Sequence, residues 1–185
     1  MDKSETMSVG IVVERRESKS PWIDAVWKPV SIIPGAPAIE GWRELASGEG
    51  WRQFHAATVT LELHHTDSES YKYNLSTRTP SVFVVMEPAG EGDMPWQVLL
   101  ATASAYEGES YLTSDEGMVE AVPMPDEIKA WVRDFAEAHF APEPFKKRKR
   151  DRTPAMEEEK FGKQPIFERG GSNRGSKQGP EAGDV

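Results

Sequence analysis

The apolar residues of this chain are gathered in short, β-branched segments, and this restricts the fold more than any other feature of the sequence. Six such segments precede residue 104, at positions 7–15, 25–33, 57–64, 71–75, 80–86 and 96–103. In the third of them Val59, Leu61 and Leu63 alternate with polar residues, as in a strand with one buried face. Short turns separate the segments. We therefore predict a mainly β (α+β) fold, an antiparallel sandwich or barrel of about six strands.

Two details of the predicted strands follow from local chemistry. The polar loop 66–70 connects the segments 57–64 and 71–75, so we expect these two segments to form a β-hairpin. Pro29 lies inside the segment 25–33. Because proline has no backbone N–H to donate, this strand should lie at a sheet edge or carry a bulge at Pro29.

One C-terminal helix is expected at 126–139. Asp126 and Glu127 suit its first turn, because negative charge is favourable near the N-terminal end of a helix dipole. Apolar side chains then recur at helical spacing, at Ile128, Trp131, Val132 and Phe135. Pro142 limits the end of the helix. We expect its apolar face to close one end of the sheet, and we predict a shorter helical turn at 42–46.

The composition of the chain changes near residue 142. Residues 1–142 contain 11 basic and 23 acidic residues, a net charge of −12, whereas residues 143–185 contain 11 and 8, a net charge of +3. The second part has too few apolar residues to offset the entropy lost on ordering its chain. We expect residues 1–142 to fold alone as one β-rich globular domain. Residues 143–185 are expected to be a basic, proline- and glycine-rich arm that is disordered or wrapped on a partner.

The absence of cysteine excludes disulfide bonds, a thiolate nucleophile and cysteine-ligated zinc or iron–sulfur sites. The chain has no run of about 18 apolar residues, so we expect no transmembrane helix and no membrane partner. Its first residues are polar and acidic, unlike a signal peptide. We therefore expect a cytoplasmic protein.

Sequence motifs for catalysis, metal binding and phosphate binding are not found. The four histidines, His55, His64, His65 and His139, belong to no zinc-binding pattern. No serine lies in a nucleophile elbow, and no glycine-rich loop has the pattern of a nucleotide-binding loop. We assign no catalytic, cofactor-binding or metal-ligating residue. We expect no directly bound cofactor and no enzymatic activity of the chain by itself.

Tryptophan is abundant, with six residues, although a tryptophan is costly to leave exposed. Three that fall in predicted regular elements are expected to pack in the core: Trp27, Trp96 and Trp131. Trp22, Trp42 and Trp51 lie in segments rich in proline and glycine, where rigid aromatic side chains often anchor interfaces. For these three, contact with a partner and packing in the core remain alternatives.

A basic run opens the predicted arm, with its charges at Lys146, Lys147, Arg148, Lys149, Arg150 and Arg152. Such a run could bind nucleic-acid phosphate. However, the strongly acidic body would repel a polyanion, which argues against nucleic acid as a partner. The aromatic residues Phe145, Phe161 and Phe167 are widely spaced along the arm, which suits an arm laid over a protein surface. A solvated tail is the remaining alternative.

The order of several motifs over residues 8–152 resembles an uncharacterised bacterial family, a domain of unknown function. The motifs include Val9-Gly10-Ile11-Val12-Val13-Glu14-Arg15-Arg16, Trp27-Lys28-Pro29-Val30, Val122-Pro123-Met124-Pro125 and Glu143-Pro144-Phe145-Lys146-Lys147-Arg148-Lys149-Arg150. Members of that family are typically encoded beside genes for molybdenum- or tungsten-dependent formate dehydrogenases. Some carry the label of molybdopterin-guanine dinucleotide biosynthesis protein A, a nucleotidyltransferase that needs a glycine-rich nucleotide loop, which this sequence lacks.

The resemblance implies a partner for this chain. We expect a non-catalytic small subunit or assembly protein that binds the large catalytic subunit of a formate dehydrogenase. The expected contacts are Trp22, Trp42 and Trp51 together with the basic and aromatic residues of the arm. The alternatives are a biosynthesis or carrier protein for the molybdopterin cofactor and a protein that binds nucleic acid through the arm.

Overall fold

The computed structural model describes residues 3–112 and 117–141. The strands in this part of the chain are β1 (Ser4–Glu17), β2 (Ala25–Pro34), β3 (Arg43–Gly48), β4 (Trp51–His64), β5 (Ser81–Pro88), β6 (Trp96–Thr102) and β7 (Met118–Pro123). The helices are α1 (Ser68–Ser76), preceded by the 3-10 turn η1 (His65–Asp67), α2 (Ala105–Tyr111) and α3 (Asp126–His139). The predicted mainly β, α+β fold is confirmed.

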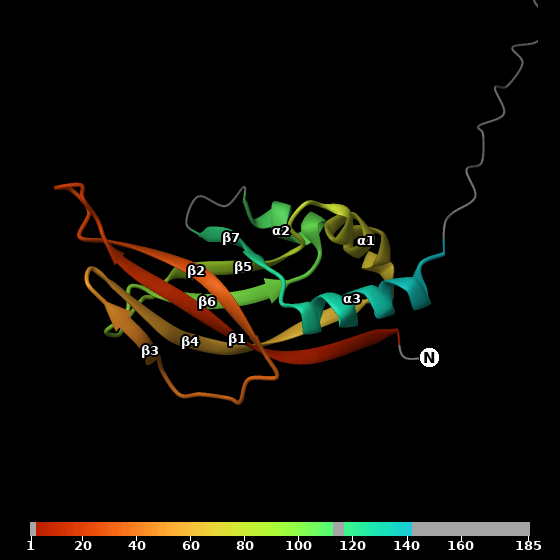
Figure 1. The fold of residues 1–185 in the computed structure, drawn as a ribbon, viewed down its shortest axis with the longest axis horizontal. Coiled ribbons are helices and arrows are strands. Elements are labelled where there is room, and N and C mark those ends of the chain that lie inside the picture. The colour runs from red at the N-terminus through yellow and green to blue at the C-terminus, as the bar shows by residue number, and fades with distance from the viewer. Residues whose placement is uncertain (1–2, 113–116, 142–185) are drawn as a thin grey trace, which may run out of the picture. The chain divides into compact units, whose positions relative to one another are not determined.

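Two antiparallel sheets pack against each other. One has the strand order β2-β1-β4-β3 and the other β6-β5-β7. The sheets approach each other where β2 lies near β7 and where β4 lies near β6, and an ion pair of 3.5 Å joins Lys28 Nζ on β2 to Glu120 Oε2 on β7. The described strands thus form two open sheets rather than a closed barrel. The turns of the β1–β2 and β3–β4 hairpins lie at one end of the body, and α1 and α3 lie at the other (Figure 1).

The core lies between the sheets and beneath α3. On β1, Val9, Ile11 and Val13 occupy alternate positions and belong to this core cluster, whereas Val12 on the opposite face is also buried but lies outside the cluster. Helix α3 contributes Ile128, Val132 and Phe135 to the same cluster. The buried surface of α3 follows the apolar spacing seen in the sequence, and the helix predicted at 126–139 is confirmed.

The structure also confirms five of the six predicted strands and the position of Pro29. β2 is an edge strand of its sheet. The register between β1 and β2 shifts by one residue next to Pro29: Val12 lies opposite Ser31, whereas Val13 lies opposite Pro29. Proline is therefore accommodated both by an edge and by a bulge, where its missing donor costs no ladder hydrogen bond.

The predicted hairpin of 57–64 with 71–75 is wrong. Residues 71–75 belong to helix α1, although Tyr71, Tyr73 and Leu75 alternate with polar residues. In the helix Tyr71 and Asn74 are buried and Tyr73 is half exposed, which is the three-residue spacing of a helical face. A five-residue pattern fits both periods, and packing of this segment against α3 and α2 decided between them.

The helical turn predicted at 42–46 is also wrong, because Arg43–Gly48 form strand β3. This strand pairs with β4, with Arg43 opposite His55 and Gly48 opposite Trp51. Gly50 has φ of 74° and permits the tight turn between the two strands. The pairing with β4 satisfies backbone groups that a single helical turn at the surface would leave to water.

Strand β7, helix α2 and the 3-10 turn η1 were not predicted. In the described residues no helix is both long enough and apolar enough to cross a membrane. The predicted arm, residues 143–185, lies outside the described part of the chain.

Candidate functional site

A groove lies where β4 and β6 end and where η1, α1 and α2 begin. Its volume is about 740 Å³. Most of the residues that line it have polar side chains, and the lining residues are Thr60, Glu62, His64, Thr66, Asp67, Glu69, Ser70, Leu100, Ala101, Thr102, Ser104, Tyr106, Glu107 and Ser110. We call this hollow the β4–β6 groove.

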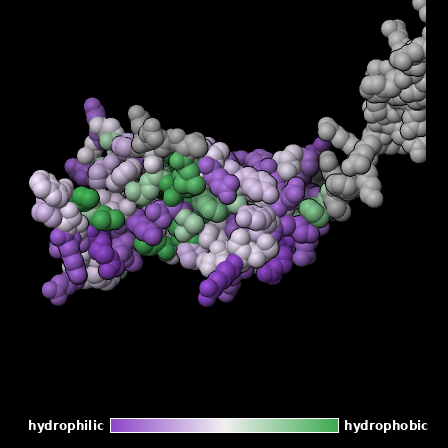
Figure 2. Space-filling model, turned by 90° about the horizontal axis from the view of Figure 1, so that it is seen from above, coloured by the Kyte–Doolittle hydropathy of each residue, from purple (hydrophilic) through white to green (hydrophobic). Residues whose placement is uncertain are grey.

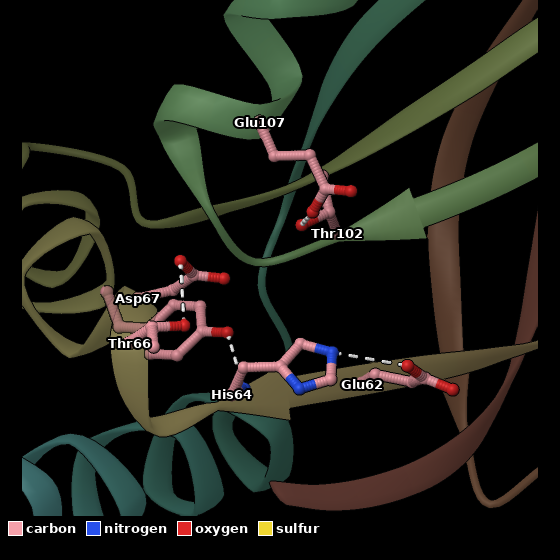
Figure 3. A network of polar contacts seen from close by, with 7 residues as sticks. Glu62, His64, Thr66, Asp67, Thr102 and Glu107 are labelled. Carbon is pink, nitrogen blue, oxygen red and sulfur yellow. Dashed lines mark hydrogen bonds and ion pairs between the residues drawn. The ribbon is translucent and has the colours of Figure 1, made fainter.

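One wall of the groove is formed by the end of β4 and by η1 (Figure 3). His64 Nε2 lies 3.2 Å from Glu62 Oε2, and the two side chains are both about half exposed. A hydrogen bond holds the end of β4 in place, because the backbone N–H of His64 donates to Tyr71 Oη at 3.0 Å. Tyr71 thus ties the end of β4 to helix α1.

The opposite wall is formed by the end of β6 and the start of α2, with Thr102 and Glu107 facing the first wall across the hollow (Figure 3). Thr102 Oγ1 donates to Glu107 Oε2 at 2.6 Å, and it accepts from the backbone N–H of Ser104 at 3.1 Å. Ser104 is the N-cap of α2, since its hydroxyl accepts from the backbone N–H of Glu107 at 3.3 Å. These bonds fix the direction in which α2 leaves the sheet.

Two buried hydroxyls join α1 to α2 under the groove. Ser70 Oγ and Ser104 Oγ are 2.9 Å apart, and both residues are buried. The backbone N–H of Tyr106 also donates to Ser70 Oγ, at 3.3 Å. A connected network of buried hydrogen bonds therefore supports the groove. Removing either serine hydroxyl would leave a buried group without its hydrogen-bond partner.

The charge of the groove is negative. Four carboxylates line it, from Glu62, Asp67, Glu69 and Glu107, whereas no lysine or arginine is among the lining residues. Burial of the ring raises the pKa of the Tyr71 hydroxyl to about 12, and the nearby charges of Asp67 and Glu107 act in the same direction. The arrangement offers hydrogen-bond acceptors and negative potential, which suit the binding of a cationic group.

The raised pKa of Tyr71 gives a testable pH dependence. Above pH about 10 the unfolded chain loses the phenolic proton and the folded chain keeps it until about pH 12, so this residue's contribution to stability falls across that interval. Relative to the Tyr71→Phe variant, we expect the wild-type free energy of unfolding to fall by about 2 kcal/mol from pH 9 to pH 12. Urea titrations of both proteins at each pH measure the difference. Parallel pH profiles for the two proteins would contradict the assignment.

A second exposed feature is the turn between β1 and β2. Trp22 is 90% exposed there, and Ile23 and Val26 beside it are half exposed. The turn is ordered by its own hydrogen bonds, including one from the N–H of Ser18 to the carbonyl oxygen of Asp24 at 3.2 Å. Seen from above, hydrophobic residues gather at the end of the body that carries this turn as well as over its middle (Figure 2). We call Trp22, Ile23 and Val26 the hairpin tip.

The other two tryptophans proposed as partner contacts lie differently. Trp42 is partly buried, and its ring centroid is 5.7 Å from that of Trp27 and 5.8 Å from that of Phe54. Trp51 is partly buried over Gly48, where a side chain at position 48 would collide with the indole. The structure thus separates Trp22 from the other two, and a partner contact for each of the three stays a prediction.

The three tryptophans expected in the core are half-buried and pack against it: Trp27, Trp96 and Trp131. The indole Nε1–H of Trp131 also donates to Glu5 Oε2 at 2.7 Å. The predicted contacts of the arm, Phe145, Phe161, Phe167 and the basic residues from Lys146 to Arg152, lie outside the described residues.

Sequence reasoning missed the β4–β6 groove entirely. One usable signal was the pattern Ser104-Ala105-Tyr106-Glu107, in which a serine is followed three residues later by a glutamate, as at many helix N-termini. It would have revealed α2. Nothing local indicated that residues 60–70 and 100–110 meet.

Comparison with known proteins identifies a family. The sequence model of a family described as "Protein of unknown function (DUF3305)" matches residues 8–149. No curated protein and no solved structure matches the chain.

Proposed function

This chain belongs to the DUF3305 family, and from that premise we propose that it is a non-catalytic accessory subunit or assembly protein that binds the large catalytic subunit of a molybdenum- or tungsten-dependent formate dehydrogenase. The identity of the partner rests on the resemblance carried by the sequence motifs. The binding role rests on the hairpin tip.

The observation that carries the binding role is the exposure of Trp22. An indole that is 90% exposed gives up the hydrophobic stabilisation that most tryptophans gain by burial. The backbone that carries it is nevertheless ordered, since the N–H of Trp22 donates to Ser20 Oγ at 3.4 Å and the N–H of Ile23 to the carbonyl oxygen of Ser20. A tryptophan presented on a hydrogen-bonded turn, with apolar neighbours, is typical of an interface anchor.

The arm is the second proposed contact. We propose that the basic run from Lys146 to Arg152 attracts an acidic surface of the large subunit, and that Phe145, Phe161 and Phe167 fill apolar pockets on it. Charge then speeds association, and buried aromatic rings slow dissociation. Neutralising Lys146 to Arg150 should therefore lower the association rate mainly at low salt.

The direct test is the Trp22→Ala variant of the full chain, measured by surface plasmon resonance on the purified large subunit. Loss of a buried aromatic anchor should weaken binding about 30-fold or more, mainly through faster dissociation. Leu112→Ala is the matched control, because Leu112 is likewise an exposed apolar residue, 63% accessible, but it caps the C-terminal end of α2 and is not part of the hairpin tip. This control should bind as the wild type does.

Equal affinity of the Trp22→Ala variant and the wild type would remove the hairpin tip from the interface. Failure of the wild type to bind the large subunit at all would contradict the proposed function. Calorimetric titration with magnesium-GTP then tests the cofactor-biosynthesis alternative, for which a stoichiometric, saturable heat is expected.

A further inference from the structure

We infer that the β4–β6 groove binds the cationic side chains of a lysine- or arginine-rich peptide segment presented by a protein partner. This inference goes beyond the proposed function, because it concerns a different surface from the hairpin tip and does not depend on which protein supplies the segment.

The first argument is a concave site whose lining includes an exposed aromatic side chain, Tyr106, which we call the aromatic wall. Tyr106 stacks on Tyr73 of α1, which is outside the lining itself, with ring centroids 6.0 Å apart and planes inclined by 29°. The two residues are 53% and 52% exposed, so this stack is not part of the core. Exposed tyrosine faces beside a hollow are a preferred environment for guanidinium and ammonium groups.

The second argument is that the aromatic wall is held in place before any ligand arrives. Tyr106 is attached to Ser70 of α1 through its backbone N–H, and Ser70 is in turn bonded to Ser104, the N-cap of α2. The helices that carry the two rings are therefore fixed to each other by buried hydrogen bonds. Such preorganisation lowers the entropy lost on binding.

The third argument is that the four carboxylates of the groove favour a positively charged ligand. Glu62 and Asp67 lie on one wall, Glu107 on the other and Glu69 on α1, so a bound cation would meet acceptors from both sides. Ionised carboxylates accept hydrogen bonds and donate none, which matches the donor-only groups of lysine and arginine. A groove of about 740 Å³ exceeds the size of a single such side chain, so we infer a segment with several basic residues.

The first experiment measures fluorescence anisotropy of a labelled hexa-arginine peptide titrated with the full chain. The double variant Glu62→Gln/Glu69→Gln should bind the peptide about tenfold more weakly, since it removes two charges from the groove. The matched control is Glu40→Gln/Glu91→Gln, which makes the same change in net charge at exposed positions outside the groove. This control should stay within about twofold of the wild type. Equal weakening by both double variants would show attraction to the overall negative charge and would overturn the inference.

The second experiment tests the aromatic wall. Tyr106→Ala should weaken binding of the same peptide about fivefold, whereas Tyr106→Phe, which keeps the ring, should bind as the wild type does. Unchanged binding by Tyr106→Ala would overturn the inference. Competition with spermidine distinguishes a peptide segment from a free polyamine, because spermidine that displaces the peptide at an equal concentration would assign the groove to polyamines instead. Thermal melts of each variant confirm that the fold is retained.

Discussion

Replacing Asn74 with alanine is expected to lower the free energy of unfolding by about 3 kcal/mol, because one buried side chain holds three segments together. Asn74 Nδ2 donates to the carbonyl oxygens of Ser81 at 2.7 Å and Ala103 at 2.8 Å. Its Oδ1 accepts from the N–H of Ser81 at 3.0 Å. Alanine would leave these backbone groups of β5 and of the β6–α2 connection buried without partners.

Chemical denaturation of the wild type and the variant, followed by tryptophan fluorescence, measures this loss. Asn74→Asp tests the direction of the bonds, because a carboxylate keeps the acceptor for Ser81 but repels the two carbonyl oxygens. It should be at least as destabilising as alanine at neutral pH. Ser76→Ala on the same helix is the control, since Ser76 is exposed and should change stability by less than about 0.5 kcal/mol. An Asn74→Ala loss as small as that of Ser76→Ala would show that water replaces the amide.

Replacing Phe135 with alanine is expected to cost about 3–5 kcal/mol, the range typical of a large buried ring. Phe135 is 2% exposed on the inner face of α3. Its ring lies edge-on to Tyr71, with centroids 6.2 Å apart, and 4.5 Å from the ring of His139. Alanine would leave a cavity between α1 and α3, at the end of the body where these helices cover the core.

The measurement is again equilibrium unfolding, with Arg133→Ala as the control because Arg133 is exposed on the same helix. The control should lose less than about 0.5 kcal/mol. Because the cavity would lie beside Tyr71, Phe135→Ala should also weaken the pH dependence predicted for that tyrosine, by admitting water to its ring. A small loss of stability would mean that α3 does not close the core.

The sequence by itself determined the elements whose pattern is long or chemically unambiguous. Helix α3 is 14 residues long and its apolar residues recur at helical spacing, so only a helix could bury Ile128, Val132 and Phe135 together. Strand β1 is equally clear, and Pro29 was placed correctly because the missing donor is a local property of the residue. In these cases the physical cause acts within a few neighbouring residues.

Tertiary structure decided the elements whose pattern is short or depends on a distant partner. Residues 71–75 suit either period, and Asn74 becomes decisive only when Ser81 and Ala103 are near it. Strand β3 exists because β4 offers an edge to pair with.

The β4–β6 groove is the extreme case. Its walls come from residues 60–70 and 100–110, and its frame is the contact between Ser70 and Ser104. Each of these residues alone is an ordinary polar residue of a surface turn. Their burial and their shared hydrogen bonds arise only when the two sheets pack, because the free energy of such contacts depends on which distant groups exclude water together.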